Sequence, residues 1–186
     1  RPSKILGSHR VENGFLVQTF IPSAKEIGLL IDGNKNPVAM QCVDEAGFFA
    51  CFVGRKQAFK YKFIVKYDNE VEQTISDPYS FESIYTEEDL SKFDAGINYE
   101  IYEKMGAKPM TLSGVEGVNF SVWAPEAMRV SVVGDFNLWD GRRHQMNRLG
   151  DFGVFEIFIP GVRVGDLYKF EVKNKKGEPM LKSDPY

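Results

Sequence analysis

The chain has 186 residues, of which 43% are hydrophobic and 13% aromatic, so it can build one large or two small globular cores. Lysine and arginine total 23 against 26 aspartates and glutamates, a net charge of −3, which argues against a nucleic-acid-binding protein. The apolar runs are too short for a transmembrane span, so no membrane partner is expected.

The first part of the chain reads as a series of short strands. Residues 1–13 are polar, and we expect them to be only partly ordered. From Gly14, apolar or alternating runs are separated by turn residues, as in antiparallel sheets. The expected strands are 15–20, 27–31, 38–43, 48–53, 60–67 and 70–75. Their length and spacing predict a β-sandwich over residues 1–81.

The sequence pattern of residues 82–111 differs from that of the strands before it and favours helices. The run Thr86-Glu87-Glu88-Asp89 offers an N-cap followed by acidic residues, which favour the start of a helix. Leu90 and Phe93 would share one face of that helix. A second short helix is expected at about 99–105. The stretch therefore predicts a structured helical connector rather than a flexible linker.

From Gly117 the sequence pattern of the first block is repeated. Four single residues recur 103 positions later, and two tripeptides recur 107 positions later. The pairs are Gly14/Gly117, Pro22/Pro125, Ala24/Ala127, Asp32/Asp135, Tyr61-Lys62-Phe63/Tyr168-Lys169-Phe170 and Asp77-Pro78-Tyr79/Asp184-Pro185-Tyr186. Two copies are too few for a solenoid. We therefore predict an all-β chain of two tandem immunoglobulin-like β-sandwiches, 1–81 and 112–186, joined by a short helical connector.

The second copy contains a turn-rich loop from Gly134 to Gly141 with two aromatic residues, Phe136 and Trp139. Aromatic residues in such a loop either pack beneath it or present a face to a ligand. Phe136 and Trp123 are expected in the core or in an interface. The polar residues of the loop are expected to hold it by side-chain to backbone bonds; these are Asp135, Asn137 and Asp140.

No catalytic residue, metal site or cofactor is expected. The two cysteines, Cys42 and Cys51, lie in apolar strands and are expected to be reduced and buried. The only histidines are His9 and His144, so there is no Cys/His cluster, and both are expected to be ordinary surface or hydrogen-bonded residues. The reduced thiols and the absence of a signal-like apolar block make a cytoplasmic location the expectation.

Five runs carry a resemblance to a known family. They are Ile101–Met110, Phe120–Ala127, Val130–Met146, Leu167–Glu171 and Lys182–Tyr186. The chain resembles the N-terminal region of bacterial 1,4-alpha-glucan (glycogen) branching enzymes of glycoside hydrolase family 13, most sharply from about residue 97. The Asp-Gly-Arg-Arg-His extension at Asp140–His144 is typical of branching enzymes. In that family, two sandwiches that are carbohydrate-binding modules of family 48 precede a (β/α)8 barrel.

The resemblance implies a non-catalytic N-terminal part of a branching enzyme, because a barrel needs about 250 residues and would follow Tyr186. The whole enzyme would transfer α-1,4 chains to α-1,6 branch points in glycogen biosynthesis. This part would position the glucan, support the barrel and be inactive alone. Two alternatives stay open: a stand-alone glycogen-binding or regulatory module, and a purely structural interaction protein.

The resemblance also implies a weak site for α-1,4-glucan. The indole of Trp139 would stack on a glucose ring with its N–H free to donate, helped by Lys169 and Asn137. The alternative, which we favour, is that Trp139 packs under the loop or against the barrel. Relatives that bind strongly have a second tryptophan shortly before the closing Asp-Pro, where this chain has Met180 and Leu181.

The basic run Arg142, Arg143 and His144 is either a solvated surface or a docking site for carboxylates of the barrel. In the first copy, Gly33–Asn36 replaces the Phe-Asn-Leu-Trp run, and Lys62 has no aromatic partner. The first sandwich is therefore predicted to be an architectural arm that binds sugar weakly or not at all.

Overall fold

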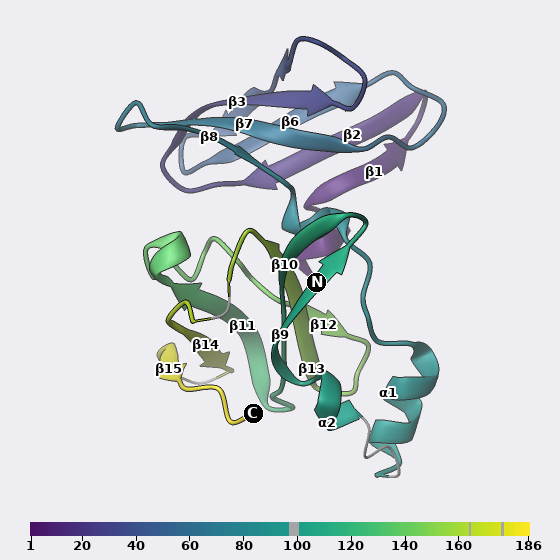
Figure 1. Cartoon of the computed structure of the whole chain (residues 1–186), viewed down its shortest axis with the longest axis vertical. Coiled ribbons are helices and arrows are strands. Elements are labelled where there is room, and N and C mark those ends of the chain that lie inside the picture. Colours follow the sequence, from purple (N-terminus) through teal and green to yellow (C-terminus); the bar gives the residue numbers. More distant parts are fainter. Residues whose placement is uncertain (97–100, 164, 176) are drawn as a thin grey trace. The chain divides into compact units, whose positions relative to one another are not determined.

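The computed structural model describes residues 1–96, 101–163, 165–175 and 177–186, and divides into two compact units (Figure 1). The first unit is Ser3–Ser80, and the second is Phe81–Tyr186 together with Arg1–Pro2. Both are built from antiparallel sheets, which confirms the predicted all-β class. Within the described residues, no helix has the length and apolar character that spanning a membrane would require.

The first unit contains two four-stranded sheets, in the orders β1-β2-β6-β5 and β4-β3-β7-β8. Its strands are β1 Gly7–Val11, β2 Gly14–Phe20, β3 Ala24–Ile31, β4 Val38–Ala39, β5 Gln41–Asp44, β6 Phe48–Val53, β7 Tyr61–Tyr67 and β8 Glu72–Ile75, with single 3-10 turns η1 Pro2–Lys4 and η2 Pro78–Ser80. The predicted strand 38–43 is divided at Met40, whose buried side chain enters the core and whose N–H donates to the Ile27 carbonyl. The chain changes sheets at that point.

The expectation of only partial order for residues 1–13 was wrong. Strand β1 pairs in register with β2, from Gly7 opposite Gln18 to Val11 opposite Gly14. It is an edge strand, so it needs no continuous apolar face, and its polar composition concealed it.

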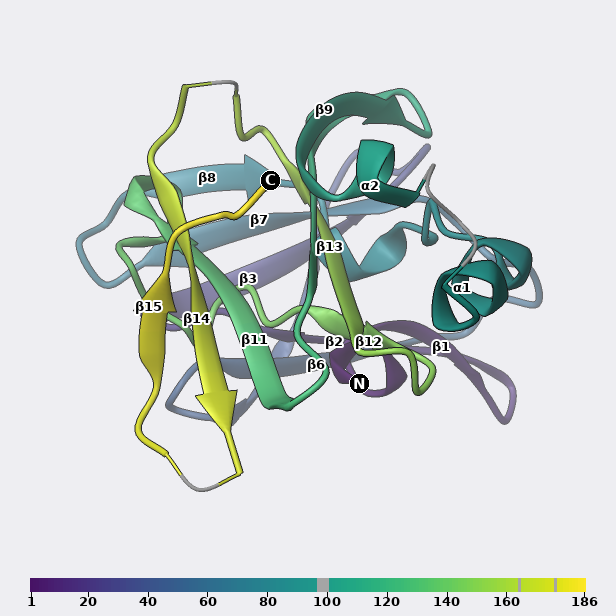
Figure 2. The same ribbon diagram turned by 90° about the horizontal axis from the view of Figure 1, so that it is seen from below.

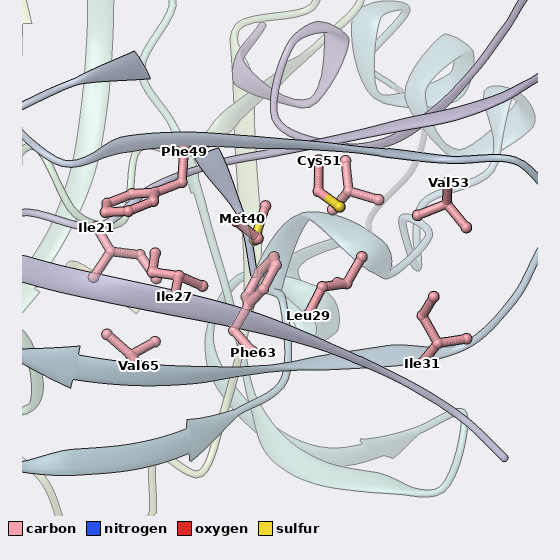
Figure 3. Packing of buried hydrophobic residues seen from close by; sticks show 11 residues of the cluster. Ile21, Ile27, Leu29, Ile31, Met40, Phe49, Cys51, Val53, Phe63 and Val65 are labelled. Carbon is pink, nitrogen blue, oxygen red and sulfur yellow. The ribbon is translucent and has the colours of Figure 1, made fainter. Parts of the chain in front are cut away.

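The core of the first sandwich lies between its two sheets. Figure 3 shows aliphatic and aromatic side chains from both sheets interleaved there. The buried members are Val17, Ile21, Ile27, Leu29, Ile31, Met40, Phe49, Cys51, Val53, Phe63 and Val65. Cys51 is buried as predicted, but Cys42 is exposed because its whole strand, β5, lies at the edge of the sheet; both thiols are free.

The second unit pairs a four-stranded sheet, β12-β13-β10-β9, with a three-stranded sheet, β11-β14-β15, whose strands lie side by side in Figure 2. Its elements are α1 Glu87–Asp94, α2 Ile101–Lys104, β9 Gly106–Leu112, β10 Val115–Trp123, β11 Ala127–Gly134, the 3-10 turn η3 Asp135–Asn137, β12 Asn147–Leu149, β13 Val154–Pro160, β14 Tyr168–Asn174 and β15 Met180–Lys182. Strand β9 lies in the range assigned to the connector. It was not predicted because it contains Pro109, which only an edge strand tolerates.

Helix α1 begins as the sequence indicated. The Thr86 side chain accepts from the Asp89 backbone N–H, and the Asp89 carboxylate accepts from the Thr86 N–H, each at 3.0 Å. Leu90 is buried and Phe93 packs against the same apolar cluster, so the two residues share a face. The second predicted helix is present as α2, while the part of that prediction at 99–100 lies outside the described residues.

The connector packs on the second sandwich through buried polar bonds. The Glu156 carboxylate on β13 accepts from the Ile84 N–H at 3.2 Å and from Asn119 Nδ2 at 3.1 Å. Burial raises the pKa of this carboxyl group. The Tyr85 hydroxyl lies 2.6 Å from Ser121 Oγ on β10. The connector is therefore a layer of the second unit.

Trp123 does not lie in the core. Its side chain is 49% exposed at the end of β10, and its ring meets the edge of Phe93 with centroids 5.9 Å apart. Trp123 was predicted to pack in the core or in an interface. In the structure it packs only against Phe93 of α1 among the described ring contacts.

The structure shows the internal repeat in matching contacts. Tyr61 donates to the Asp77 carboxylate at 2.6 Å, and Tyr168 donates to the Asp184 carboxylate in the same way. A β-carbon on Gly14 would lie 2.3 Å from the Val53 carbonyl oxygen, and one on Gly117 would lie 2.5 Å from that of Ile159. The repeated glycines are therefore required by a close approach of the neighbouring strand.

Candidate functional site

The loop that follows β11 rests on a buried asparagine. Asn137 Oδ1 accepts from the Gly134 N–H at 3.0 Å, while Nδ2 donates to the Val132 carbonyl at 2.8 Å and to His144 Nδ1 at 2.9 Å. Both amide hydrogens of Asn137 are thus used inside the loop. The structure places this predicted sugar-binding residue beneath the surface, where it supports the loop.

His144 is also buried, so it is not part of a surface basic cluster. Its backbone carbonyl accepts from the Val132 N–H at 3.1 Å, and its ring lies 5.9 Å from that of Phe136. Burial lowers the pKa of the imidazole well below its usual value, and the nearby charge of Arg143 lowers it further. The ring is therefore neutral, and Nδ1 accepts the hydrogen bond from Asn137.

Arg142 forms a two-pronged pair with Asp140. Its Nε donates to Oδ1 at 3.0 Å and its terminal nitrogen to Oδ2 at 2.8 Å, while the Arg142 backbone N–H also donates to Oδ1 at 2.9 Å. These bonds lower the pKa of the Asp140 carboxyl group. The side chain of Arg142 stays exposed and that of Arg143 is half-buried. The surface part of the predicted basic run is therefore reduced to these two arginines.

Trp139 stands at the surface of the loop, and the residue is 39% exposed. Its ring N–H donates to the Asp135 carboxylate at 2.9 Å, and its backbone N–H donates to the Gly134 carbonyl at 2.9 Å. The expectation of a free indole N–H was wrong, because the carboxylate four residues earlier accepts it. The bond holds the indole in one orientation while part of the ring faces solvent.

Lys169 lies on β14 directly opposite Val133 of β11. Its strand neighbours, Tyr168 and Phe170, turn toward the core, so the Lys169 side chain projects from the other face, where it is exposed. Among the described side-chain hydrogen bonds, which include those of Asn137 with His144 and of Trp139 with Asp135, none joins Lys169 to the loop.

The sequence analysis did not single out two exposed leucines, Leu138 next to Trp139 in the chain and Leu167 before β14. Leu138 is 87% exposed, and Leu167 is 69% exposed. The Leu167 carbonyl oxygen would lie 2.4 Å from a β-carbon on Gly134, which places Leu167 at the base of the loop. The sequence feature that could have indicated an exposed Leu138 is the position of an aliphatic residue within a run of turn-forming residues. The loop thus carries one exposed apolar side chain next to Trp139 in the chain and has another, Leu167, at its base.

Comparison with known families defines the class of protein. Residues 104–186 match carbohydrate-binding module 48 (isoamylase N-terminal domain). Residues 1–79 match the N-terminal domain of the alpha-1,4-glucan branching enzyme GlgB. The chain is thus a tandem of β-sandwich modules, the second of which is a member of a carbohydrate-binding family.

The similar proteins include two 1,4-alpha-glucan branching enzymes. The 1,4-alpha-glucan branching enzyme GlgB of Thermosynechococcus vestitus is 44% identical over 190 residues, which cover 100% of this chain and 24% of that protein. The corresponding protein of Trichormus variabilis is also 44% identical over 190 residues, covering 100% of this chain and 25% of its own. The chain corresponds over its whole length to the N-terminal region of 1,4-alpha-glucan branching enzymes.

The chain spans about a quarter of the length of these curated relatives. Among solved structures, pullulanase type I from Bacillus subtilis, crystallised with maltose, aligns with 97% of this chain and 24% of its own, at 18% identity and a TM-score of 0.38.

Proposed function

We propose that this chain is the glucan-positioning, non-catalytic part of a protein that branches α-1,4-glucan. The observation that carries the proposal is the order of two family matches in one chain, 1–79 and 104–186, together with 44% identity across its full length to branching enzymes. The whole protein would cut an α-1,4 linkage and transfer the released chain to a 6-hydroxyl group. A cytoplasmic location belongs to the proposal and is supported by two free thiols.

The proposed contact surface for glucan is the half-exposed indole of Trp139, with the exposed Lys169 as a donor to sugar hydroxyls. The apolar C–H face of glucose matches the flat face of an indole, and the bond to Asp135 removes the cost of ordering the ring. Binding is expected to be weak, since Met180 and Leu181 stand where a second aromatic platform would strengthen it.

The proposed contact with the catalytic part of the protein involves Arg142 and Arg143. The Arg142 guanidinium is exposed, but Asp140 already accepts from two of its nitrogens, so the pair presents little net charge to a partner. This weakens the docking role of Arg142.

Retardation in a native gel containing glycogen tests the proposal directly. We expect the chain to migrate more slowly as glycogen is added, and Trp139→Ala to remove about 1–3 kcal/mol of binding, the range for losing one buried aromatic contact. Met128→Ser, an exposed residue near the start of β11, is the matched control. Equal migration of all three proteins with and without glycogen would refute glucan binding. The isolated chain should show no branching activity in an iodine assay.

A further inference from the structure

Leu138 and Trp139 have an unusual backbone. Their φ angles are 55° and 58°, both in the left-handed region. The other described non-glycine residues with positive φ are polar ones in turns; they are Asn13, Ser23, Glu70 and Ser113. Large apolar residues rarely take this conformation, because the β-carbon crowds the backbone. Two in succession mark the loop as strained.

The sandwich does not require this strain. In the first copy, the turn after β3 contains Gly33, whose φ of 88° carries no steric penalty. That turn is short, and the first sandwich closes around a complete core with it. The strained pair in the second copy is therefore an addition to the shared fold.

Leu138 also adds little to the stability of the fold. At 87% exposed, its side chain makes almost no contact that excludes water. Beneath it the loop is fixed by the bonds of Asn137 to Val132 and His144, and beside it the indole is held by Asp135. The loop thus presents an apolar side chain on a rigid support.

We propose that Leu138 is a glucan-contacting residue that extends the Trp139 platform to the next glucose unit of an α-1,4-linked chain. The proposal rests on the proposed function of the same loop. Leu138 lies within the residues that match a carbohydrate-binding module, and it is adjacent to a half-exposed indole. An aliphatic side chain beside an indole offers apolar surface to the C–H rows of successive sugar rings.

The test uses the whole chain and the variants Leu138→Gly and Met128→Ser, titrated with maltoheptaose by calorimetry and unfolded with urea. Glycine adopts the left-handed conformation freely, so Leu138→Gly should leave the urea midpoint unchanged or higher. Its affinity for maltoheptaose should fall roughly three- to tenfold, the range for partial burial of one leucine. Met128→Ser changes another exposed apolar residue, 58% exposed against 87% for Leu138, near the other end of β11, and should bind like the parent chain.

Each outcome is decisive. Weaker binding by Leu138→Gly with an undiminished urea midpoint supports the proposal. Unchanged binding by Leu138→Gly together with lost binding by Trp139→Ala overturns it and leaves Trp139 as the whole platform. A parent chain that does not bind maltoheptaose at all overturns the glucan function itself, and with it the role of Leu138. A fall in the urea midpoint of Leu138→Gly would show that the leucine serves the fold.

Discussion

At the scale of single residues, the loop after β11 depends on a neutral histidine. His144 is buried with Nδ1 accepting from Asn137, and Asn137 in turn holds the backbone of Val132 and Gly134. A proton on Nδ1 would face the Asn137 N–H, and the positive ring would be repelled by the nearby charge of Arg143. The loop therefore rests on a group that must stay uncharged.

The pH dependence of stability follows from that lowered pKa. A histidine whose folded pKa lies below its unfolded value of about 6.5 contributes stability that is full above that value and is lost as pH falls. We expect the second unit to lose up to about 1.4 kcal/mol per pH unit below pH 6.5 through this group. His144→Gln keeps an acceptor for Asn137. Between pH 7 and pH 5, the urea midpoint of this variant should depend less on pH than that of the parent chain. Equal slopes for both proteins would contradict this account.

The same residues show what sequence can reveal about a site. The types and order of Asn137, Trp139 and His144 indicated a turn-rich loop here, which the structure contains, because turn formers and aromatic residues are local signals. Their burial could not be read from the sequence. Whether an imidazole lies beneath a loop or on it depends on how the loop folds over β11, and that is decided by contacts such as the one between Ser131 Oγ and the Gly141 carbonyl, 2.7 Å long.

At the scale of elements, the repeated tyrosine–aspartate pair closes each sandwich. In the first unit Tyr61 on β7 donates to Asp77, and in the second Tyr168 on β14 donates to Asp184. Each aspartate also accepts from the backbone N–H of the tyrosine two residues later, Tyr79 or Tyr186. The burial differs, because Asp77 is 1% exposed and Asp184 is only half-buried.

This difference predicts unequal costs for one substitution made in both copies. Tyr61→Phe leaves a fully buried carboxylate without one of its donors, which should cost about 1–3 kcal/mol of unfolding free energy. Tyr168→Phe leaves a carboxylate that water can reach, so it should cost roughly 1 kcal/mol or less. Urea unfolding of the two variants, followed by circular dichroism, gives both values. A larger cost for Tyr168→Phe would show that burial does not set the strength of this pair.

The strands themselves were largely predictable, and the exceptions share a cause. Alternation identified the central strands β2, β6 and β7, whose inward residues, such as Val17 and Phe63, form the core. The edge strands β1 and β9 were missed because an edge needs neither a continuous apolar face nor every backbone N–H. Pairing across the sheet, which is not a local property, defines them.

At the scale of the whole molecule, the two units have separate cores and different spectroscopic signals. Both tryptophans, Trp123 and Trp139, belong to the second unit, while the first unit contains none. Tryptophan fluorescence therefore reports the unfolding of the second unit, whereas circular dichroism reports both. This allows the two sandwiches to be followed separately in the intact chain.

We predict that the two units unfold independently. Phe63→Ala removes a fully buried ring from the first core and should destabilise that unit by about 3–5 kcal/mol. Phe120→Ala is the matched change in the second unit, because Phe120 is equally buried on β10. Phe63→Ala should move part of the circular-dichroism transition to lower urea and leave the fluorescence transition in place, while Phe120→Ala should move the fluorescence transition. If Phe63→Ala shifts both signals together, the sandwiches form one cooperative unit, and the first sandwich then stabilises the module that carries Leu138 and Trp139.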